Sequence, residues 1–169
     1  ERELIESKEA LERKTEELTE SNRRLRESEA RYSTALAAGR MGSWETDLVA
    51  RTRIWTKEGM ALFGLTLADG RGHVGGDDDE YRSALHRDDR HLVQRFHELA
   101  DKQDSFTSEY RVVWPDGTTL WLRGRGQVVA RAPDGKAQRL VSIVTDVTER
   151  KAAEDHIQFL MHEISHRSK

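Results

Sequence analysis

Residues 109–126 read EYRVVWPDGTTLWLRGRG. Two runs rich in β-branched and aromatic residues flank Pro115–Gly117, a triplet in which Pro fixes φ, Asp hydrogen-bonds its own backbone and Gly takes a positive φ. A second such triplet, at residues 133–135, precedes AQRLVSIVTDV at residues 137–147. The pattern predicts three consecutive antiparallel strands joined by tight turns.

Two further strands and several helices are expected upstream of this meander. The alternation of Trp44, Thr46 and Leu48 predicts one strand, and RTRIW at residues 51–55 predicts a second. Helical spacing follows in three stretches, at residues 56–65, 78–85 and 87–103. The prediction is an α+β fold, a five-stranded antiparallel sheet with helices inserted after the second strand. Four tryptophans are expected to pack on the sheet faces: Trp44, Trp55, Trp114 and Trp121.

The composition excludes several function classes. The 169 residues contain no cysteine, which excludes disulfide bonds, thiolate zinc sites and thiol chemistry. A formal net charge of −3 gives no electrostatic basis for binding nucleic acid or an anionic membrane. No continuous apolar stretch is long enough to span a bilayer, and we expect the chain to be cytoplasmic.

A glycine- and aspartate-rich stretch at residues 68–80 is predicted to be a loop. Within it, GGDDDE at residues 75–80 resembles the GGDEF signature of diguanylate cyclases, but it lacks the phenylalanine, and we reject that interpretation. Asp77, Asp78 and Asp79 could bind a metal ion, but a solvated acidic loop is favoured, and the sequence predicts no metal site.

Both ends of the chain have the pattern of a dimerising helix. Near the N-terminus, leucines recur every seven residues, the period of a left-handed coiled coil, at Leu4, Leu11, Leu18 and Leu25. Near the C-terminus, the spacing is four, three and four, at Ala153, Ile157, Leu160 and Ile164. We expect a homodimer; a solvated single helix is the alternative at the N-terminus. The predicted division is a coiled-coil helix at residues 1–31, a globular domain at 32–146 and an exit helix at 147–169.

The predicted exit helix opens on a capping-box spacing. Asp146 is followed three residues later by Glu149, so its carboxylate can accept from the Glu149 amide while Glu149 reaches back. This spacing predicts that the helix starts directly after the last strand.

Together these motifs resemble a PAS (Per-Arnt-Sim) sensor domain. The resemblance covers residues 32–154 and is carried by GSWETDL at 42–48, the run at 109–126 and DVTERKAAE at 146–154. It implies a sensory and dimerising module. It also implies that the signal passes from the sheet to an effector helix through Asp146, Thr148, Glu149 and Arg150.

The resemblance does not lead us to predict a cofactor. Without cysteine the chain cannot form the flavin–thiol adduct of light-sensing LOV domains. Haem-binding PAS domains use a histidine on the long helix, where His91 and His97 lie, but we expect both to be structural. His86 and either Asp88 or Asp89 are expected to cap that helix.

The last seven residues, EISHRSK at 163–169, are similar to the phosphoacceptor box of the HWE and related histidine kinases. The resemblance makes His166 the phosphoacceptor and gives supporting roles to Glu163, Arg167 and Lys169. His162 is the rival, because a histidine followed by an acid and a hydrophobe also opens the acceptor box of the larger histidine kinase class. The remaining alternative is that both are ordinary solvated histidines.

The implied function is the sensory and dimerisation region of a two-component histidine kinase, cut at the start of its phosphotransfer helix. The sequence has no glycine-rich phosphate loop or ATP-binding box, so we expect this chain not to phosphorylate itself. The ATP-binding kinase domain is expected elsewhere in the parent protein, with a response regulator as partner and no role for nucleic acid. The alternative is a PAS interaction module that feeds a non-kinase effector.

Overall fold

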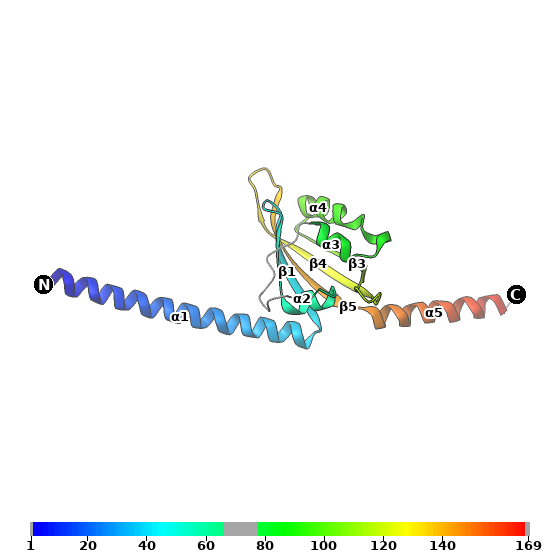
Figure 1. The fold of residues 1–169 in the computed structure, drawn as a ribbon, viewed down its shortest axis with the longest axis horizontal. Helices are drawn as coiled ribbons and strands as arrows, with labels where there is room; N and C mark the ends of the chain where they lie inside the picture. The colour runs from blue at the N-terminus through cyan, green and yellow to red at the C-terminus, as the bar shows by residue number, and fades with distance from the viewer. Residues whose placement is uncertain (1, 66–77, 168–169) are drawn as a thin grey trace. The chain divides into compact units, whose positions relative to one another are not determined.

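A computed structural model describes residues 2–65 and 78–167 (Figure 1). The chain divides into two units, Glu1–Ala38 and Gly39–Lys169. The first unit is one unbroken helix, α1 (Arg2–Ala38), whose polar faces carry ion pairs such as Arg23–Glu27. The four heptad leucines of α1 are all exposed and form an apolar stripe: Leu4, Leu11, Leu18 and Leu25.

The second unit is built on a five-stranded antiparallel sheet. Its strands are β1 (Met41–Asp47), β2 (Thr52–Trp55), β3 (Ser105–Val113), β4 (Thr119–Arg131) and β5 (Ala137–Asp146). Their order in space is β2-β1-β5-β4-β3, so the last strand lies in the middle, paired with both β1 and β4. The α+β class and the five-stranded sheet are confirmed.

The meander turns follow the chemistry read from the two Pro-Asp-Gly triplets. Gly117 and Gly135 have φ of 88° and 87°, the region that glycine enters without strain. In the first turn the amide of Gly117 donates to the carbonyl of Trp114 over 2.9 Å, and Asp116 accepts from the amide of Thr118. These turns set the β3–β4 and β4–β5 registers.

The helices inserted between β2 and β3 cover one face of the sheet. They are α2 (Lys57–Leu62), α3 (Asp78–Ala84), a 3₁₀ turn η1 (Arg87–Asp89) and α4 (Leu92–Lys102). Figure 1 shows α3 and α4 on one side of the sheet, and α4 contacts β3, β4 and β5. The insertion predicted after the second strand is therefore confirmed.

Aromatic side chains form the core beneath these helices. Trp44 and Trp55 pair across β1 and β2 with ring centroids 4.8 Å apart, and Phe63 meets both rings edge-on. Tyr81 of α3 and Tyr110 of β3 complete the cluster. The packing predicted for Trp44 and Trp55 is confirmed.

Helix α2 lies against β1 because both elements carry a glycine at the crossing. A Cβ added at Gly42 would lie 2.3 Å from the Cα of Gly59, so neither position has room for a side chain. Thr56 fixes the start of α2: its hydroxyl accepts from the Gly59 amide and donates to the Ser43 carbonyl.

The prediction that Asp88 or Asp89 caps the long helix is wrong. Helix α4 starts after His91, which makes no capping hydrogen bond with its side chain. Asp88 and Asp89 belong instead to η1, where Nδ1 of His86 accepts from the Asp88 amide over 3.3 Å. His86 therefore caps the short turn that precedes α4, not α4 itself.

The chain leaves the sheet as α5 (Thr148–Arg167), immediately after Val147. Its apolar residues are exposed, including Ile157 at 60% and Ile164 at 64%, and no residue of α5 is buried. Within the described parts of the chain, no helix is long and apolar enough to cross a membrane.

Candidate functional site

Several hydrogen bonds hold the junction between the sheet and α5. The amide of Val147 donates to the carbonyl of Trp121 over 2.8 Å, and the hydroxyl of Thr148 accepts from the Trp121 amide over 3.0 Å. One residue of β4 thus uses both backbone polar groups to hold the start of the helix. The exit direction of α5 is fixed by β4, although α5 follows β5 in the chain.

Asp146 completes this junction, but not as the predicted capping box. Its Oδ1 accepts from the amide of Thr148 over 2.9 Å and from the Thr148 hydroxyl over 2.6 Å. The carboxylate turns back within two residues, as in an Asx turn, because α5 begins at Thr148 and leaves Glu149 inside the first turn. The bonding partner of Asp146 is therefore Thr148, and the Asp146–Glu149 capping box is corrected.

Glu109 of β3 binds the first turn of α5 from the neighbouring strand. It accepts from Arg150 and, over 2.7 Å, from the Nζ of Lys151, and its side chain is only 29% exposed. The hydrogen bond from Lys151 is the main cause that lowers the pKa of Glu109 below its ordinary value. Lys151 Nζ also lies 4.8 Å from the centroid of the Trp121 ring, a cation–π contact.

The same ring receives a second cation, from the side of η1. The guanidinium carbon of Arg111, which pairs with Trp121 across β3 and β4, lies 5.2 Å from the ring centroid. Arg111 is held by Asp89 through three hydrogen bonds: Nε and Nη2 donate over 3.0 and 2.7 Å, and the backbone amide donates over 2.8 Å. The hydrogen bond from Arg111 lowers the pKa of Asp89.

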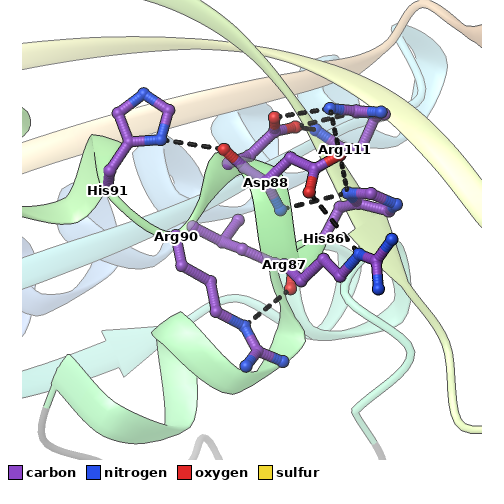
Figure 2. Close-up of polar contacts among 8 residues, drawn as sticks. His86, Arg87, Asp88, Arg90, His91 and Arg111 are labelled. Atoms are coloured by element: carbon purple, nitrogen blue, oxygen red, sulfur yellow. Dashed lines mark hydrogen bonds and ion pairs between the residues drawn. The ribbon is translucent and has the colours of Figure 1, made fainter.

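Figure 2 shows the polar contacts that surround η1. Arg111 reaches over from β3, Nδ1 of His91 lies 2.8 Å from the carbonyl of Asp88, and Arg90 donates to the carbonyl of Leu85. The start of α4, the turn η1 and strand β3 are thus tied together. A series of contacts joins the helical layer to α5 through one indole ring. We name it the Trp121 bridge, and its residues are Asp89, Arg111, Trp121, Lys151 and Glu109.

A cavity of about 50 Å³ lies between α4 and the sheet. Its walls combine aromatic, aliphatic and polar residues, and the aromatic ones are Trp44, Tyr81, Phe96, Phe106 and Tyr110. Gly124 and Gly126 of β4 make room for the rings of β3: a Cβ at Gly126 would lie 2.7 Å from Phe106. His97 lines this cavity, whereas the Nδ1 of His91 is engaged with the Asp88 carbonyl.

The described residues leave less open volume in this cavity than a flavin or a haem occupies. Pockets for ligands of that size are roughly 300–1,000 Å³, several times the volume that the described residues leave open. With no cysteine in the chain, a flavin could not form a thiol adduct either.

Comparison with known proteins identifies the fold. The sequence profile of a family described as PAS fold matches residues 54–144, from β2 to β5. The chain belongs to the PAS family. The Trp121 bridge and the junction with α5 are therefore features of a PAS domain and the helix that leaves it.

Relatives of this PAS domain occur in signalling proteins. A blue-light-activated histidine kinase of Brucella anthropi is 34% identical over 130 residues, 76% of this chain and 25% of that protein. A sensory box histidine kinase/response regulator of Burkholderia thailandensis gives a TM-score of 0.65 at 24% identity, over 80% of this chain and 98% of the solved chain. The N-terminal domain of a diguanylate cyclase with a PAS/PAC sensor, from Marinobacter aquaeolei, gives a TM-score of 0.54 at 17% identity. That match covers 66% of this chain and 98% of the solved chain. This chain thus spans a quarter of the curated kinase.

The residues predicted for phosphotransfer lie on α5. The rings of His162 and His166 are 4.9 Å apart, and Arg167 donates to Glu163 over 3.1 Å. All four side chains are exposed. Lys169 lies outside the described residues, as do Asp77 and the side chain of Asp78 from the rejected metal loop. In the described residues, no group of three or more histidine or acidic side chains is placed to hold a metal ion.

Sequence reasoning missed most of the Trp121 bridge. It selected Asp146, Thr148 and Arg150, which do lie at the junction, but it left out Glu109, Arg111 and Lys151. Arg111 alone has a sequence signal: the antiparallel pairing of the two strands around the first turn puts it opposite Trp121 on one sheet face. That pairing was available once the Pro115–Gly117 turn had been assigned.

Proposed function

We propose that this chain is the sensory and dimerisation region of a two-component histidine kinase of the HWE or a related type. In this proposal α5 is the start of the dimerisation and phosphotransfer helix, and His166 is its phosphoacceptor. The observation that carries it is continuity: α5 runs unbroken from the Thr148 junction to Arg167, so it links the PAS sheet and His166 by one rigid element. The kinship with a blue-light-activated histidine kinase supports it.

The side chain of His166 has the properties that phosphoryl transfer needs. It is exposed on a helix and can offer one unprotonated ring nitrogen as the nucleophile. With Ile157 and Ile164 at a positions of the seam, His166 takes an outer c position, open to a catalytic domain. Arg167 is one residue away, although its guanidinium contacts Glu163 in this structure. It can turn to pair with phosphate oxygens.

The signal is proposed to reach His166 through the Trp121 bridge. A change at α4 or in the cavity alters the position of η1 and Asp89, and hence of Arg111 over the indole ring. Lys151 meets the same ring from α5, so the first turn of that helix responds. A signal acts only if it stabilises one of two packings of α5 over the other.

Dimerisation supplies the two packings in this proposal. The exposed leucines of α1 and the exposed apolar residues of α5 form two apolar stripes within the described residues. A rotation of α5 changes how its seam, Ala153, Ile157, Leu160 and Ile164, meets the second copy. The ATP-binding domain and the response regulator belong to the rest of the system, which acts in the cytoplasm, and no flavin is required.

Labelling of the full-length parent tests this function. The parent is incubated with labelled ATP, and acid-labile phosphate is compared in wild type, His166→Ala and His162→Ala. The expected result is label on wild type that is lost with His166→Ala and kept with His162→Ala. Label lost only with His162→Ala contradicts the choice of histidine, and no label on wild type contradicts the kinase.

A second candidate is a PAS module that feeds a non-kinase effector. The kinship in fold with the sensor domain of a diguanylate cyclase favours keeping it. The parent sequence after Lys169 discriminates between the two. An asparagine, a second apolar helix and an ATP-binding domain support the kinase, and a different catalytic domain supports the alternative.

A further inference from the structure

Two imidazoles lie side by side on the outer face of α5. His162 and His166 are four residues apart, one turn of helix, and their ring centroids are separated by 4.9 Å at an interplanar angle of 69°. Both side chains are exposed. The neighbouring cation Arg167 is directed to Glu163, which compensates its charge.

This spacing suits a chelate. Imidazole nitrogen binds Zn²⁺, Cu²⁺ and Ni²⁺, and the metal–nitrogen bond is about 2.0–2.1 Å long. Two nitrogens on one ion are therefore at most about 4 Å apart. Rings whose centroids lie 4.9 Å apart meet that requirement after a small rotation about their side-chain torsions.

We propose that His162 and His166 form a two-point chelate for a borderline divalent transition-metal ion, with water completing its coordination. The site needs no residue from a second chain. On the seam defined by Ile157 and Ile164, the two histidines take f and c positions, so dimerisation through α5 leaves them open. The acidic loop considered in the sequence supplies none of the ligands.

The chelate has a predictable selectivity. Affinity should rise from Co²⁺ to Ni²⁺ to Cu²⁺ and be lower for Zn²⁺ than for Cu²⁺. Mg²⁺ prefers oxygen ligands and should not bind, so magnesium bound to ATP does not compete. If His166 is the phosphoacceptor, a bound ion occupies the lone pair that attacks phosphate; this consequence, unlike the chelate itself, rests on the proposed function.

Isothermal titration calorimetry of the 169-residue chain with Cu²⁺, Ni²⁺ and Zn²⁺ tests the chelate directly. Loss of an outer-shell partner costs about 10–100-fold in metal affinity, so loss of a ligand, in His162→Ala or His166→Ala, should cost at least about tenfold. His156→Ala is the matched control on the same helix and should bind like wild type. Equal weakening in the control, or single variants within twofold of wild type, overturns the chelate.

A variant with the same amino-acid composition tests whether metal binding depends on the spacing of the two histidines or only on their number. Met161→His combined with His162→Met keeps both imidazoles but places them five residues apart, about 140° around the helix. Binding should fall as far as in His166→Ala, with the helical circular dichroism unchanged. Retained affinity would show that isolated histidines bind the ion, and would overturn the proposal.

The consequence for phosphotransfer is measured separately in the full-length parent. Zn²⁺ should lower the acid-labile label, EDTA should restore it, and His162→Ala should raise the inhibitory concentration at least about tenfold. Failure in calorimetry overturns the chelate whatever the label shows. Absence of label without metal contradicts the proposed function instead, while the chelate is decided by calorimetry alone.

Discussion

Replacing Asp146 by alanine removes the two hydrogen bonds that close the turn before α5. Both end on Thr148, at 2.9 and 2.6 Å, and Asp146 itself is exposed. Loss of a helix cap of this kind costs about 0.5–2 kcal/mol, and exposed hydrogen bonds lie at the low end. The bonds from Trp121 and the ion pairs of Glu109 remain, so α5 stays attached. We expect the free energy of unfolding of the chain to fall by about 1 kcal/mol.

Two measurements check this prediction in the 169-residue chain. Urea denaturation gives the global loss, and a melting temperature should fall by about 2–4 °C. Amide hydrogen exchange at Thr148 should accelerate about fivefold, the factor that corresponds to about 1 kcal/mol, while exchange in β5 stays close to wild type. Asp146→Asn is the matched control, because its side-chain oxygen can still accept both hydrogen bonds and should preserve most of the protection.

In the full-length parent, Asp146→Ala should change the rate of phosphorylation by more than its effect on stability accounts for. The physical reason is that the first turn of α5 gains freedom to rotate while the PAS core stays folded. A global loss above about 3 kcal/mol would place Asp146 in the scaffold, since it exceeds any cap. That result, together with unchanged exchange at Thr148, would contradict a local role of Asp146 at the start of α5.

Three further predictions concern the rest of the chain. Asp89→Ala should lower the free energy of unfolding, measured by urea denaturation at pH 7, by about 2–3 kcal/mol, because the partly buried Arg111 loses three hydrogen bonds and keeps the 4.0 Å ion pair with Asp88. Arg111 lowers the pKa of Asp89, so this stability is present above the unfolded-state value of about 3.9 and is lost as pH falls through the lower folded-state value. Gly42→Ala should cost at least about 1–3 kcal/mol in thermal melting, because its Cβ meets the backbone of Gly59. Leu18→Glu should reduce or abolish the dimer in analytical ultracentrifugation, with the melting of the PAS domain unchanged.

Each of these has a result that contradicts it. An Asp89→Ala variant that follows wild type through the whole acid range would mean that the pair with Arg111 contributes nothing. A Gly42→Ala variant as stable as wild type would mean that α2 can move away from β1. A Leu18→Glu variant that remains fully dimeric would assign dimerisation to another surface.

The strands were predictable because local signals and tertiary structure agree. Two Pro-Asp-Gly triplets fix the turns, and the β-branched runs around them coincide with β3, β4 and β5. The start of α4 was not predictable in the same way. Asp89 has a residue type suited to capping, but its carboxylate bonds to Arg111, 22 residues further along the chain. A charge-assisted pair outweighs a local cap, and sequence spacing does not reveal it.

Trp121 illustrates the same limit. The sequence indicates a tryptophan on a strand, but not that its ring receives one cation from β3 and another from α5. Gly124 and Gly126 are a comparable case. The sequence does not show that their missing side chains make room for the rings of Tyr110 and Phe106. Such contacts depend on register across strands, which follows only after the sheet is known.

In the proposed function, the Trp121 bridge carries the signal from the PAS domain to His166. The measurement that tests it is the rate of acid-labile labelling of the full-length parent in Arg111→Met, Lys151→Met and the double variant, each corrected for the folded fraction. The double variant should behave like one single variant, because both substitutions act through the same indole ring. Independent effects that multiply in the double variant, or rates equal to wild type in all three, would contradict it.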